Sequence, residues 1–334
     1  MKTIPLGSTG VEVSALCLGT MYYGTTTDAQ TSMNLLDAYA EAGGTFLDTA
    51  NGYARWVEGG QGGESEGVLG KWMSERGNRQ QMFVATKVGF PSFVDDLGIG
   101  LSASQIEKAC EYSLKRLGTD TIDLMYAHND MRNTPVEERL EAFDRLVTAG
   151  KVRFIGASNT VAWRLEQARR TSREHGWAEY CCVQSRFSYI RPRAGYVNEI
   201  HAVVNDELLD YCLAENVGVL AFSPLFGGAY VREDKSFPEE YSGPDTDARL
   251  AVLHQVASEV GATVNQVILA WMIGSQPRVI PLIAASREEQ QQENLGALDV
   301  ELSTEQLERL SQANNFYTRH PDRQRPSIAG MKEG

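Results

Sequence analysis

The stretch TFLDTANGYARWVEGGQGGESEGVLGKWM, residues 45–73, contains the unit that predicts the fold of the whole chain. It opens with a short apolar run typical of a buried β-strand, passes through a glycine-rich loop and ends in a helical pattern. Asp48 comes at the end of the strand, and Tyr53 follows it in the loop. Apolar strands that alternate with helical patterns indicate βα units and a parallel sheet.

The same unit recurs along the chain, and no low-complexity or Pro/Ser-rich linker divides the sequence. The expected strands are 15–19, 45–48, 82–87, 121–127, 152–157, 180–184, 217–222 and 279–283. The expected helices between them lie near 28–42, 64–76, 102–117, 135–149, 160–175, 199–215, 245–260 and 287–297, with two additional helices near 263–273 and 303–313. Eight βα units in about 300 residues predict a (β/α)8 TIM barrel, one α/β domain over residues 1–334.

Other segments complete the predicted architecture. KTIPLG and VEVSA, on either side of residues 7–10, predict a short N-terminal β-hairpin. Loop 54–63 and the C-terminal tail 315–334 are the segments expected to be flexible. A doubly wound sheet is the alternative fold, and it would need a G-x-G-x-x-G turn after an early strand, which the sequence lacks at that place.

Helix ends are marked by specific residues. Ser102 with Gln105 predicts a capping box at the start of one helix, and Gly118 is a typical residue for its end. Thr134 before Pro135 predicts a capping residue followed by proline in the first helical position.

Composition narrows the class of protein. Lys and Arg number 31 against 44 Asp and Glu, and the net charge of −13 disfavours nucleic-acid binding through phosphates. No apolar run reaches about 18 residues, and the first residues lack a secretory apolar segment, so neither a membrane span nor a signal peptide is expected. Five cysteines without metal-site spacing, and histidines equally without it, predict a reducing, cytoplasmic location and no metal. The oligomeric state, a homo-oligomer included, stays open.

Polar or aromatic side chains occupy the carboxyl ends of seven of the eight expected strands. In a (β/α)8 barrel these ends meet at one rim, where functional residues collect. Each residue has a structural interpretation when taken alone. Asp48 could cap a turn, Lys87 could be an exposed charge at a sheet exit, and a lone histidine such as His128 is more often structural. Their gathering at one barrel mouth favours chemistry.

These groups suit proton transfer to oxygen. A tyrosine hydroxyl has a reference pKa of about 10, which is high for proton transfer at neutral pH. A neighbouring ammonium such as Lys87 favours the phenolate form of Tyr53, and a carboxylate such as Asp48 keeps the lysine charged and oriented. His128 could orient a carbonyl oxygen by hydrogen bonding. A general acid beside a hydrogen-bond donor suits carbonyl reduction, and a cofactor must supply the hydride.

Seven motifs in order and spacing resemble the aldo-keto reductase family along essentially the whole chain. They are FLDTANGY, ESEGVLGKWM, VATKVG, IDLMYAH, VRFIGASN, AFSPL and REEQQQENL. The resemblance implies a catalytic tetrad of Asp48, Tyr53, Lys87 and His128, with Tyr53 as the proton donor. It implies that NADP (NADPH) is the cofactor. The implied cofactor-binding residues are Gly19, Thr20, Ser158, Asn159, Gln184, Phe222, Ser223, Leu225, Gly227, Ser286, Arg287, Gln290 and Asn294.

Within that set the resemblance assigns separate parts of the cofactor. Ser158, Asn159 and Gln184 would hold the nicotinamide carboxamide. Phe222 would stack on the ring in place of the usual tyrosine. Residues 223–227 would lie along the pyrophosphate, and residues 286–294 would contact the adenosine end. A helix cap is the alternative role of the Ser-Asn pair.

Arg287 decides the choice between NADP and NAD. A guanidinium beside Ser286 suits bidentate contact with a 2′-phosphate, which favours NADP. The alternative is an exposed arginine at a helix start, where a positive charge is slightly unfavourable. Ala284 stands where many relatives have glycine, and its bulk would restrict backbone approach to the phosphate.

The substrate pocket is less defined by the sequence than the catalytic residues. A small-molecule carbonyl compound is the expected partner, and its candidate contacts are Tyr22, Tyr23, Trp56, Phe90, Asn129 and Arg186. Arg186 could attract an anionic or polyhydroxylated substrate, and equally could pair with an acidic residue of a loop. The glycine-rich loop with Trp56 suits a mobile flap over the substrate and equally a disordered surface insertion.

Three hypotheses follow for the function. The first is an NADPH-dependent reductase of an aldehyde, ketone or sugar. The second is a regulatory protein that keeps the barrel and the cofactor but turns over little substrate. The third is an aldolase with Lys87 as a Schiff base, and it is disfavoured because pairing with Asp48 would raise the pKa that such a lysine needs lowered.

Overall fold

The computed structural model describes residues 1–314 except residues 197 and 199. The predicted tail 315–334 lies outside the described residues.

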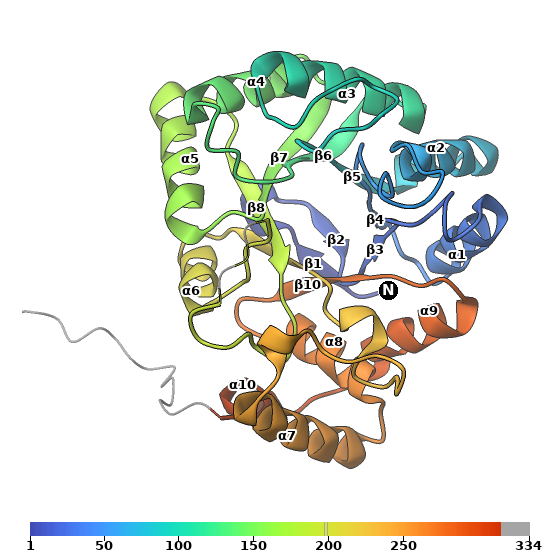
Figure 1. Ribbon diagram of the computed structural model, residues 1–334, viewed down its shortest axis with the longest axis vertical. Helices are drawn as coiled ribbons and strands as arrows, with labels where there is room; N and C mark the ends of the chain where they lie inside the picture. Colours follow the sequence, from blue (N-terminus) through green and yellow to red (C-terminus); the bar gives the residue numbers. More distant parts are fainter. Residues whose placement is uncertain (197, 199, 315–334) are drawn as a thin grey trace, which may run out of the picture.

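Eight parallel strands close into a barrel, as the sequence predicted (Figure 1). Each strand pairs with its neighbours in chain order, and the last strand pairs with the first. The strands are β3 Cys17–Gly19, β4 Phe46–Asp48, β5 Phe83–Val88, β6 Ile122–Ala127, β7 Val152–Ser158, β8 Tyr180–Arg186, β9 Gly218–Phe222 and β10 Val279–Ile283. The carboxyl ends of all eight therefore form one rim.

The predicted N-terminal hairpin packs against the other end of the barrel. Its strands β1 Thr3–Pro5 and β2 Glu12–Ser14 are antiparallel. Leu6 of the hairpin shares an apolar cluster with Cys182 and Leu220 of the barrel. Gly7 has a φ of 53°, and an added Cβ there would overlap the Cys181 carbonyl oxygen. Only glycine fits this close approach, so the hairpin seals the barrel end opposite the rim.

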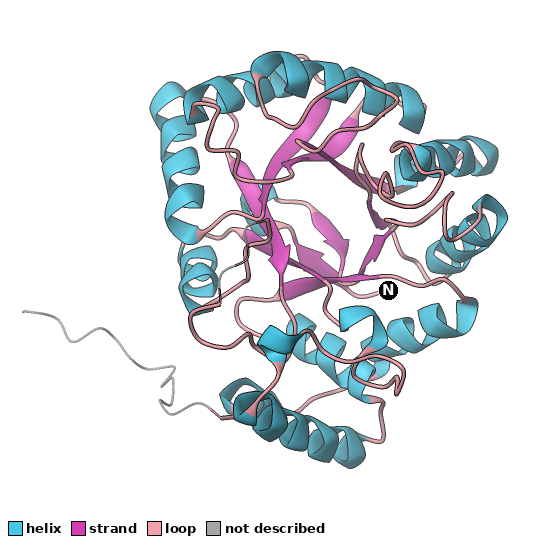
Figure 2. Ribbon diagram, in the orientation of Figure 1, coloured by secondary structure: helices cyan, strands magenta, loops and turns pink. Residues whose placement is uncertain are grey.

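Helices surround the barrel (Figure 2). They are α1 Ala29–Glu41, α2 Glu64–Arg76, α3 Ala103–Leu117, α4 Val136–Thr148, α5 Ala162–His175, α6 Asp206–Ala214, α7 Pro244–Val260, α8 Val264–Gly274, α9 Glu288–Leu295 and α10 Thr304–Gln312. Short 3-10 turns add η1 Gly7–Thr9, η2 Arg79–Gln81, η3 Phe226–Gly228, η4 Glu239–Tyr241 and η5 Gly296–Asp299.

Two helices are additional to the ring, but one of them is not the helix expected. The sequence prediction placed 245–260 in the ring and 263–273 outside it. Figure 1 shows α7 and α10 on the outside, with α8 nearer the barrel. The reason is composition: α8 is apolar around most of its circumference and buries Val264 to Met272 almost without interruption. By contrast, α7 buries only one face.

The observed helix ends confirm some of the predicted capping residues and contradict others. The capping box of Ser102 with Gln105 is present, and Gly118 ends α3 in the left-handed conformation. The Thr134 cap is wrong, because Pro135 itself is the N-cap residue of α4. The helix expected from residue 199 begins later: α6 starts at Asp206 and is capped by the Asn205 side chain. The Ser-Asn pair does not cap α5 either, since the N-cap residue of that helix is Val161.

The core has two parts. The larger apolar cluster fills the space between strands and helices, and the smaller one fills the barrel interior near the hairpin. Alternation along β8 turns Cys182 into the interior cluster and Gln184, two residues on, toward Asp48. The barrel interior thus changes from apolar to polar as it approaches the rim.

Candidate active site

The four predicted catalytic residues lie at or after the ends of three neighbouring strands and meet inside the rim. Asp48 is the last residue of β4, Lys87 lies near the end of β5, and His128 directly follows β6. Tyr53 comes from the loop after β4. The side chains of Asp48 and Lys87 are fully buried, so their charges interact away from bulk water.

The Lys87 ammonium uses all three of its donors on described acceptors. It forms an ion pair with Asp48 Oδ1 and donates to the Thr49 carbonyl oxygen at 2.9 Å. Its third contact is with the Tyr53 hydroxyl at 2.6 Å. Because an ammonium has three protons to donate, this lysine is fixed in position and fully engaged.

Asp48 is held from several sides. Gln184 donates its amide to Oδ2 at 2.7 Å, and the Tyr53 hydroxyl lies 3.3 Å from Oδ1. The Thr20 hydroxyl donates to the Asp48 carbonyl oxygen at 2.9 Å. These contacts fix the carboxylate that in turn fixes Lys87.

The pKa shifts differ from those expected from the sequence. Burial raises the pKa of Tyr53 well above its usual value, and the Asp48 carboxylate raises it further. Burial lowers the pKa of Lys87 even though Asp48 opposes that shift. Both differences have one cause, since burial of the charged form outweighs a single neighbouring charge. In this state Tyr53 carries its proton, as a general acid must.

His128 lies beside the tyrosine. Its ring meets the Tyr53 ring edge-on with centroids 5.9 Å apart, and Phe90 packs against its other side at 4.9 Å. Burial and the Lys87 charge hold the pKa of His128 well below its usual value, with a smaller contribution from His201. The imidazole is therefore neutral and can donate one ring N–H.

The Ser-Asn pair after β7 presents a buried hydrogen-bonding edge next to these four. Asn159 has a φ of 53°, and its backbone N–H donates to the Gln184 carbonyl oxygen at 3.0 Å. Its side-chain amide donates to the His128 carbonyl oxygen at 3.0 Å. Asn159 Oδ1 is buried and has no hydrogen-bond partner among the described residues. That orphaned acceptor, next to the Ser158 hydroxyl, fits an amide group of a ligand.

The loop after β9 has an unusual backbone. Phe222 ends the strand half-buried, and Ser223 and Gly227 both have positive φ values, of 55° and 61°. Lys235 returns to this loop: a Cβ added to Gly227 would lie 3.3 Å from its Nζ. An open glycine backbone beside an ammonium suits a phosphate-bearing ligand.

Another predicted cofactor segment surrounds the start of α9. The Ser286 hydroxyl and backbone N–H both lie within 3.2 Å of Gln290 Oε1, and Asn294 donates to the Ala284 carbonyl oxygen at 3.3 Å. Arg287 is the exposed N-cap residue, and no ion pair joins it to a carboxylate of the described chain. Its guanidinium is thus available to a ligand.

Other predicted cofactor contacts lie in different settings. Thr20 is fully buried behind Asp48, and its hydroxyl also contacts the Ser65 hydroxyl at 2.8 Å. A Cβ added to Gly19 would lie 3.5 Å from the Ile283 carbonyl oxygen. Leu225 is part of the apolar packing around the β9 loop. The structure therefore gives Thr20 a supporting position beneath the site.

The six predicted substrate contacts are spread over several environments. Tyr22 is 39% exposed and Trp56 57%, whereas Tyr23 is only 2% exposed and lies in the large core cluster. Phe90 touches His128, as described above. Asn129 donates to the Ile200 carbonyl oxygen at 2.9 Å. Of the predicted substrate contacts, Tyr23 is the one that lies in the core, away from the barrel mouth.

The glycine-rich loop 54–63 is tied to the loop that follows β5. Phe93 donates its backbone N–H to the Gln61 carbonyl oxygen at 2.8 Å, and Arg55 lies over the Phe93 ring. These two contacts join it to the loop after β5, and the alternative of a disordered insertion stays a prediction. Whether the loop moves over the substrate stays a prediction.

Sequence reasoning missed several residues at this site. The Thr49 carbonyl holds Lys87, and the Tyr126 ring lies 5.6 Å from the same ammonium. His201 and Lys235 reach the rim from long loops. The alternation of residues along β6 places Tyr126 in the barrel interior, on the strand next to that of Lys87, and so could have identified it. No local pattern marks His201 or Lys235.

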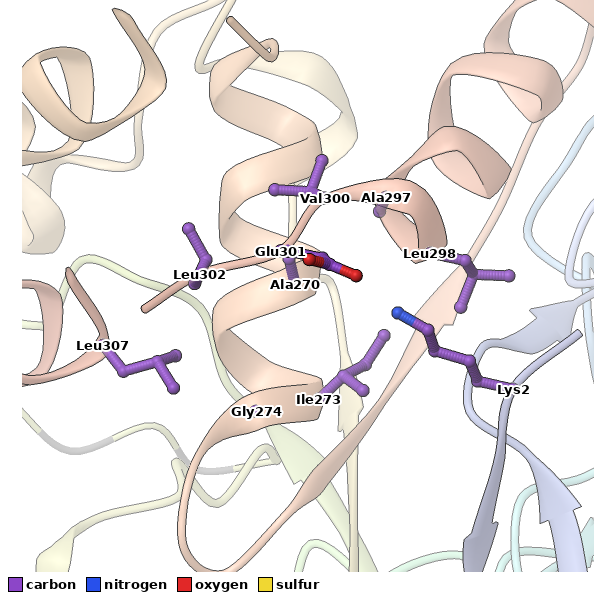
Figure 3. A pocket seen from close by; sticks show the side chains of 10 residues that line it. All are labelled: Lys2, Ala270, Ile273, Gly274, Ala297, Leu298, Val300, Glu301, Leu302 and Leu307. Carbon is purple, nitrogen blue, oxygen red and sulfur yellow. The ribbon is translucent and has the colours of Figure 1, made fainter. Parts of the chain in front are cut away.

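A groove elsewhere contains none of the four catalytic candidates. It has a volume of 360 Å³ and lies beside Lys2, at the hairpin end of the barrel (Figure 3). Its lining is mainly apolar, from α8, η5 and the segment before α10.

Comparisons with known proteins agree with the fold and define the family. The family model described as "Aldo/keto reductase family" matches residues 15–315, and the chain belongs to that family. It is 33% identical to norsolorinic acid reductase stcV of Emericella nidulans over 317 residues, which covers 89% of this chain and 77% of the relative. It is also 33% identical to the uncharacterized oxidoreductase YrpG of Bacillus subtilis, which covers 93% and 95%.

A solved structure is similar over nearly the whole chain. The thermostable aldo-keto reductase Tm1743, crystallised with the inhibitor epalrestat, is 27% identical with a TM-score of 0.73. The match covers 94% of this chain and all of that one. The chain is accordingly an oxidoreductase of the aldo-keto reductase class.

In residues 1–314 without 197 and 199, no three His, Cys, Asp or Glu side chains are grouped so as to hold a metal ion. Over the same residues, no single helix is long and apolar enough to cross a membrane.

Proposed function

We propose that this protein is an NADPH-dependent reductase that converts the carbonyl group of an aldehyde, ketone or sugar to an alcohol, with Tyr53 as the general acid. The observation that carries the proposal is the hydrogen-bonded chain from Asp48 through Lys87 to the protonated Tyr53 hydroxyl. A neutral His128 lies next to it. These are the parts needed to deliver a proton to a carbonyl oxygen.

Each residue has one task in the proposed reaction. His128 donates a ring N–H to the carbonyl oxygen and orients it. Tyr53 donates its phenolic proton to that oxygen, and the Lys87 ammonium stabilises the phenolate that remains. Asp48 holds the ammonium in place, and solvent returns a proton to the phenolate after the alcohol leaves.

The nicotinamide cofactor, when bound, supplies a hydride to the carbonyl carbon. The described residues fit it: the orphaned Asn159 Oδ1 and the Ser158 hydroxyl suit the carboxamide, and the half-buried Phe222 ring suits the nicotinamide face. Gly227 with Lys235 suits the pyrophosphate.

Arg287 supports NADPH over NADH. Its guanidinium is exposed beside Ser286 and free of carboxylate partners in the described chain. A 2′-phosphate offers the oxygens that a guanidinium binds in a bidentate manner.

The competing hypotheses receive less support. A Schiff-base aldolase needs a free amine, whereas all three donors of Lys87 are occupied. The lowered pKa of Lys87 taken alone would have favoured the aldolase. A cofactor-binding regulatory protein would keep the same groups and differs only in turnover.

The test is NADPH consumption by the purified protein against aromatic aldehydes, dicarbonyls and keto-sugars, repeated with NADH. The proposal expects turnover of at least one class with NADPH and weaker turnover with NADH. Tight NADPH binding without turnover of any class would favour the regulatory protein, and absence of NADPH binding would contradict the cofactor assignment.

A further inference from the structure

Arg186 occupies the next inward position of β8 above the catalytic residues. It follows Gln184 by two residues, so both side chains lie on the same face of the strand, separated by roughly 6.6 Å along it. Gln184 contacts Asp48, which fixes that face as the inner one. The Arg186 guanidinium lies 5.9 Å from the centre of the Phe222 ring, at the end of the adjacent strand. Arg186 thus belongs to the barrel mouth.

This guanidinium has no carboxylate partner in the part of the chain that the structure describes. Several arginines with low exposure are paired with carboxylates, as Arg116 is with Glu66 and Arg164 with Asp130, whereas buried Arg249 donates to the backbone carbonyl oxygens of Tyr189 and Ala313. Arg186 Nε is buried and forms no hydrogen bond with a described residue. A buried donor without a partner is unfavourable, and a charged one more so, so the position is suited to a ligand that supplies the acceptor.

A second unpartnered donor group lies beside it. The segment 200–204 runs along Arg186: the Arg186 N–H donates to the Ala202 carbonyl oxygen at 3.1 Å, and Val204 donates to the Arg186 carbonyl oxygen at 2.9 Å. This places His201 against the same Phe222 ring, with centroids 5.4 Å apart. His201 Nδ1 is buried without a partner among described residues.

Electrostatics agree with this arrangement. Burial lowers the pKa of His201, and the Arg186 charge lowers it further. His201 in turn contributes to the lowered pKa of His128, which joins this pair to the catalytic centre. Burial raises the pKa of nearby Tyr241, and the charge and side-chain hydrogen bonding of Arg186 oppose that shift.

We propose that Arg186, with His201 beside it, binds an anionic oxygen group of the substrate, so that this enzyme prefers carbonyl compounds that carry a carboxylate. The inference rests on the proposed reductase function and adds the substrate class. A planar guanidinium binds the two oxygens of a carboxylate in parallel, and a neutral imidazole adds one donor. A cofactor phosphate offers similar oxygens, and the test separates the two sources.

The experiment compares 4-formylbenzoate with its methyl ester, which present the same aldehyde with and without the negative charge. Wild type, Arg186→Met and Arg186→Lys are assayed with saturating NADPH. Arg170→Met, a change of the same kind at an exposed position of α5, is the matched control. We expect Arg186→Met to raise KM for 4-formylbenzoate by about 10–100-fold, the effect of losing a charge-assisted hydrogen bond. The ester should change less than twofold, and lysine should restore part of the preference.

Each contrary result has a distinct meaning. Equal losses on both substrates would assign Arg186 a structural role and overturn the inference. A weaker Kd for NADPH without a change in substrate preference would assign the guanidinium to a cofactor phosphate and overturn it as well. Failure of wild type to reduce either aldehyde would count against the reductase function. In that case calorimetry with benzoate decides the inference: binding that is lost in Arg186→Met supports it, and no binding overturns it.

Discussion

Replacement of Lys87 by methionine would leave the Asp48 carboxylate buried without its cation. Both side chains are fully buried, and the ammonium also serves the Thr49 carbonyl and the Tyr53 hydroxyl. Methionine keeps most of the length of the lysine stem and removes the charge, so packing around the stem is largely preserved.

The expected size follows from what remains around Asp48. Removal of one partner of a buried ion pair costs about 3–5 kcal/mol. Gln184 and Tyr53 still contact the carboxylate, so we expect the lower end, about 3 kcal/mol. Burial lowers the pKa of Lys87, which shows that the ammonium itself is costly to bury. The double variant Asp48→Asn/Lys87→Met should therefore lie within about 1 kcal/mol of wild type.

Urea unfolding of wild type, both single variants and the double variant measures this coupling. Arg145→Met, which removes an exposed ion pair with Glu107, is the matched control and should cost less than about 1 kcal/mol. A double variant as unstable as the sum of the single losses would refute the reasoning, because it would mean that the two charges do not depend on each other.

Three further outcomes follow from other parts of the structure. The pKa of His128 is lower in the folded protein than in the unfolded chain, so below about pH 6.5 the unfolded chain binds a proton that the folded protein does not. The free energy of unfolding should therefore fall below that pH, by at most about 1.4 kcal/mol per pH unit. His128→Asn should flatten that slope in urea unfolding at pH 5 and 7, and exposed His254→Asn should leave it unchanged. Gly7→Ala should destabilise by at least about 2 kcal/mol more than Gly10→Ala, since both have positive φ but only Gly7 lacks space for a Cβ; equal losses would contradict the sealing role of the hairpin. Arg287→Met should weaken NADPH binding by about 10–100-fold and leave NADH within threefold, and an equal loss for both cofactors would remove the 2′-phosphate assignment.

The barrel and its four catalytic candidates could be predicted because both depend on local signals. Short apolar strands alternate with helices, and a parallel barrel necessarily brings the strand ends together. Asp48, Lys87 and His128 stand at or next to such ends, and Tyr53 follows one closely. No knowledge of side-chain packing was needed for that step.

What the sequence could not supply depends on packing between distant segments. The direction of the Tyr53 pKa shift follows from burial, which no spacing reveals. Tyr23 and Tyr22 are neighbours with opposite exposure. Whether α7 or α8 lies outside the ring of helices depends on how completely α8 is buried by its neighbours. His201 reaches the barrel mouth because the segment that carries it pairs with the end of β8.

The most direct test of the proposed chemistry is single-turnover oxidation of bound NADPH by an aldehyde in wild type and Tyr53→Phe. Tyr112→Phe, on α3, is the control because its side chain is partly exposed on that helix. We predict that Tyr53→Phe keeps the Kd for NADPH within twofold and slows the oxidation step by at least about 100-fold, the usual contribution of a general acid. A rate within threefold of wild type would contradict the assignment of Tyr53 as the proton donor.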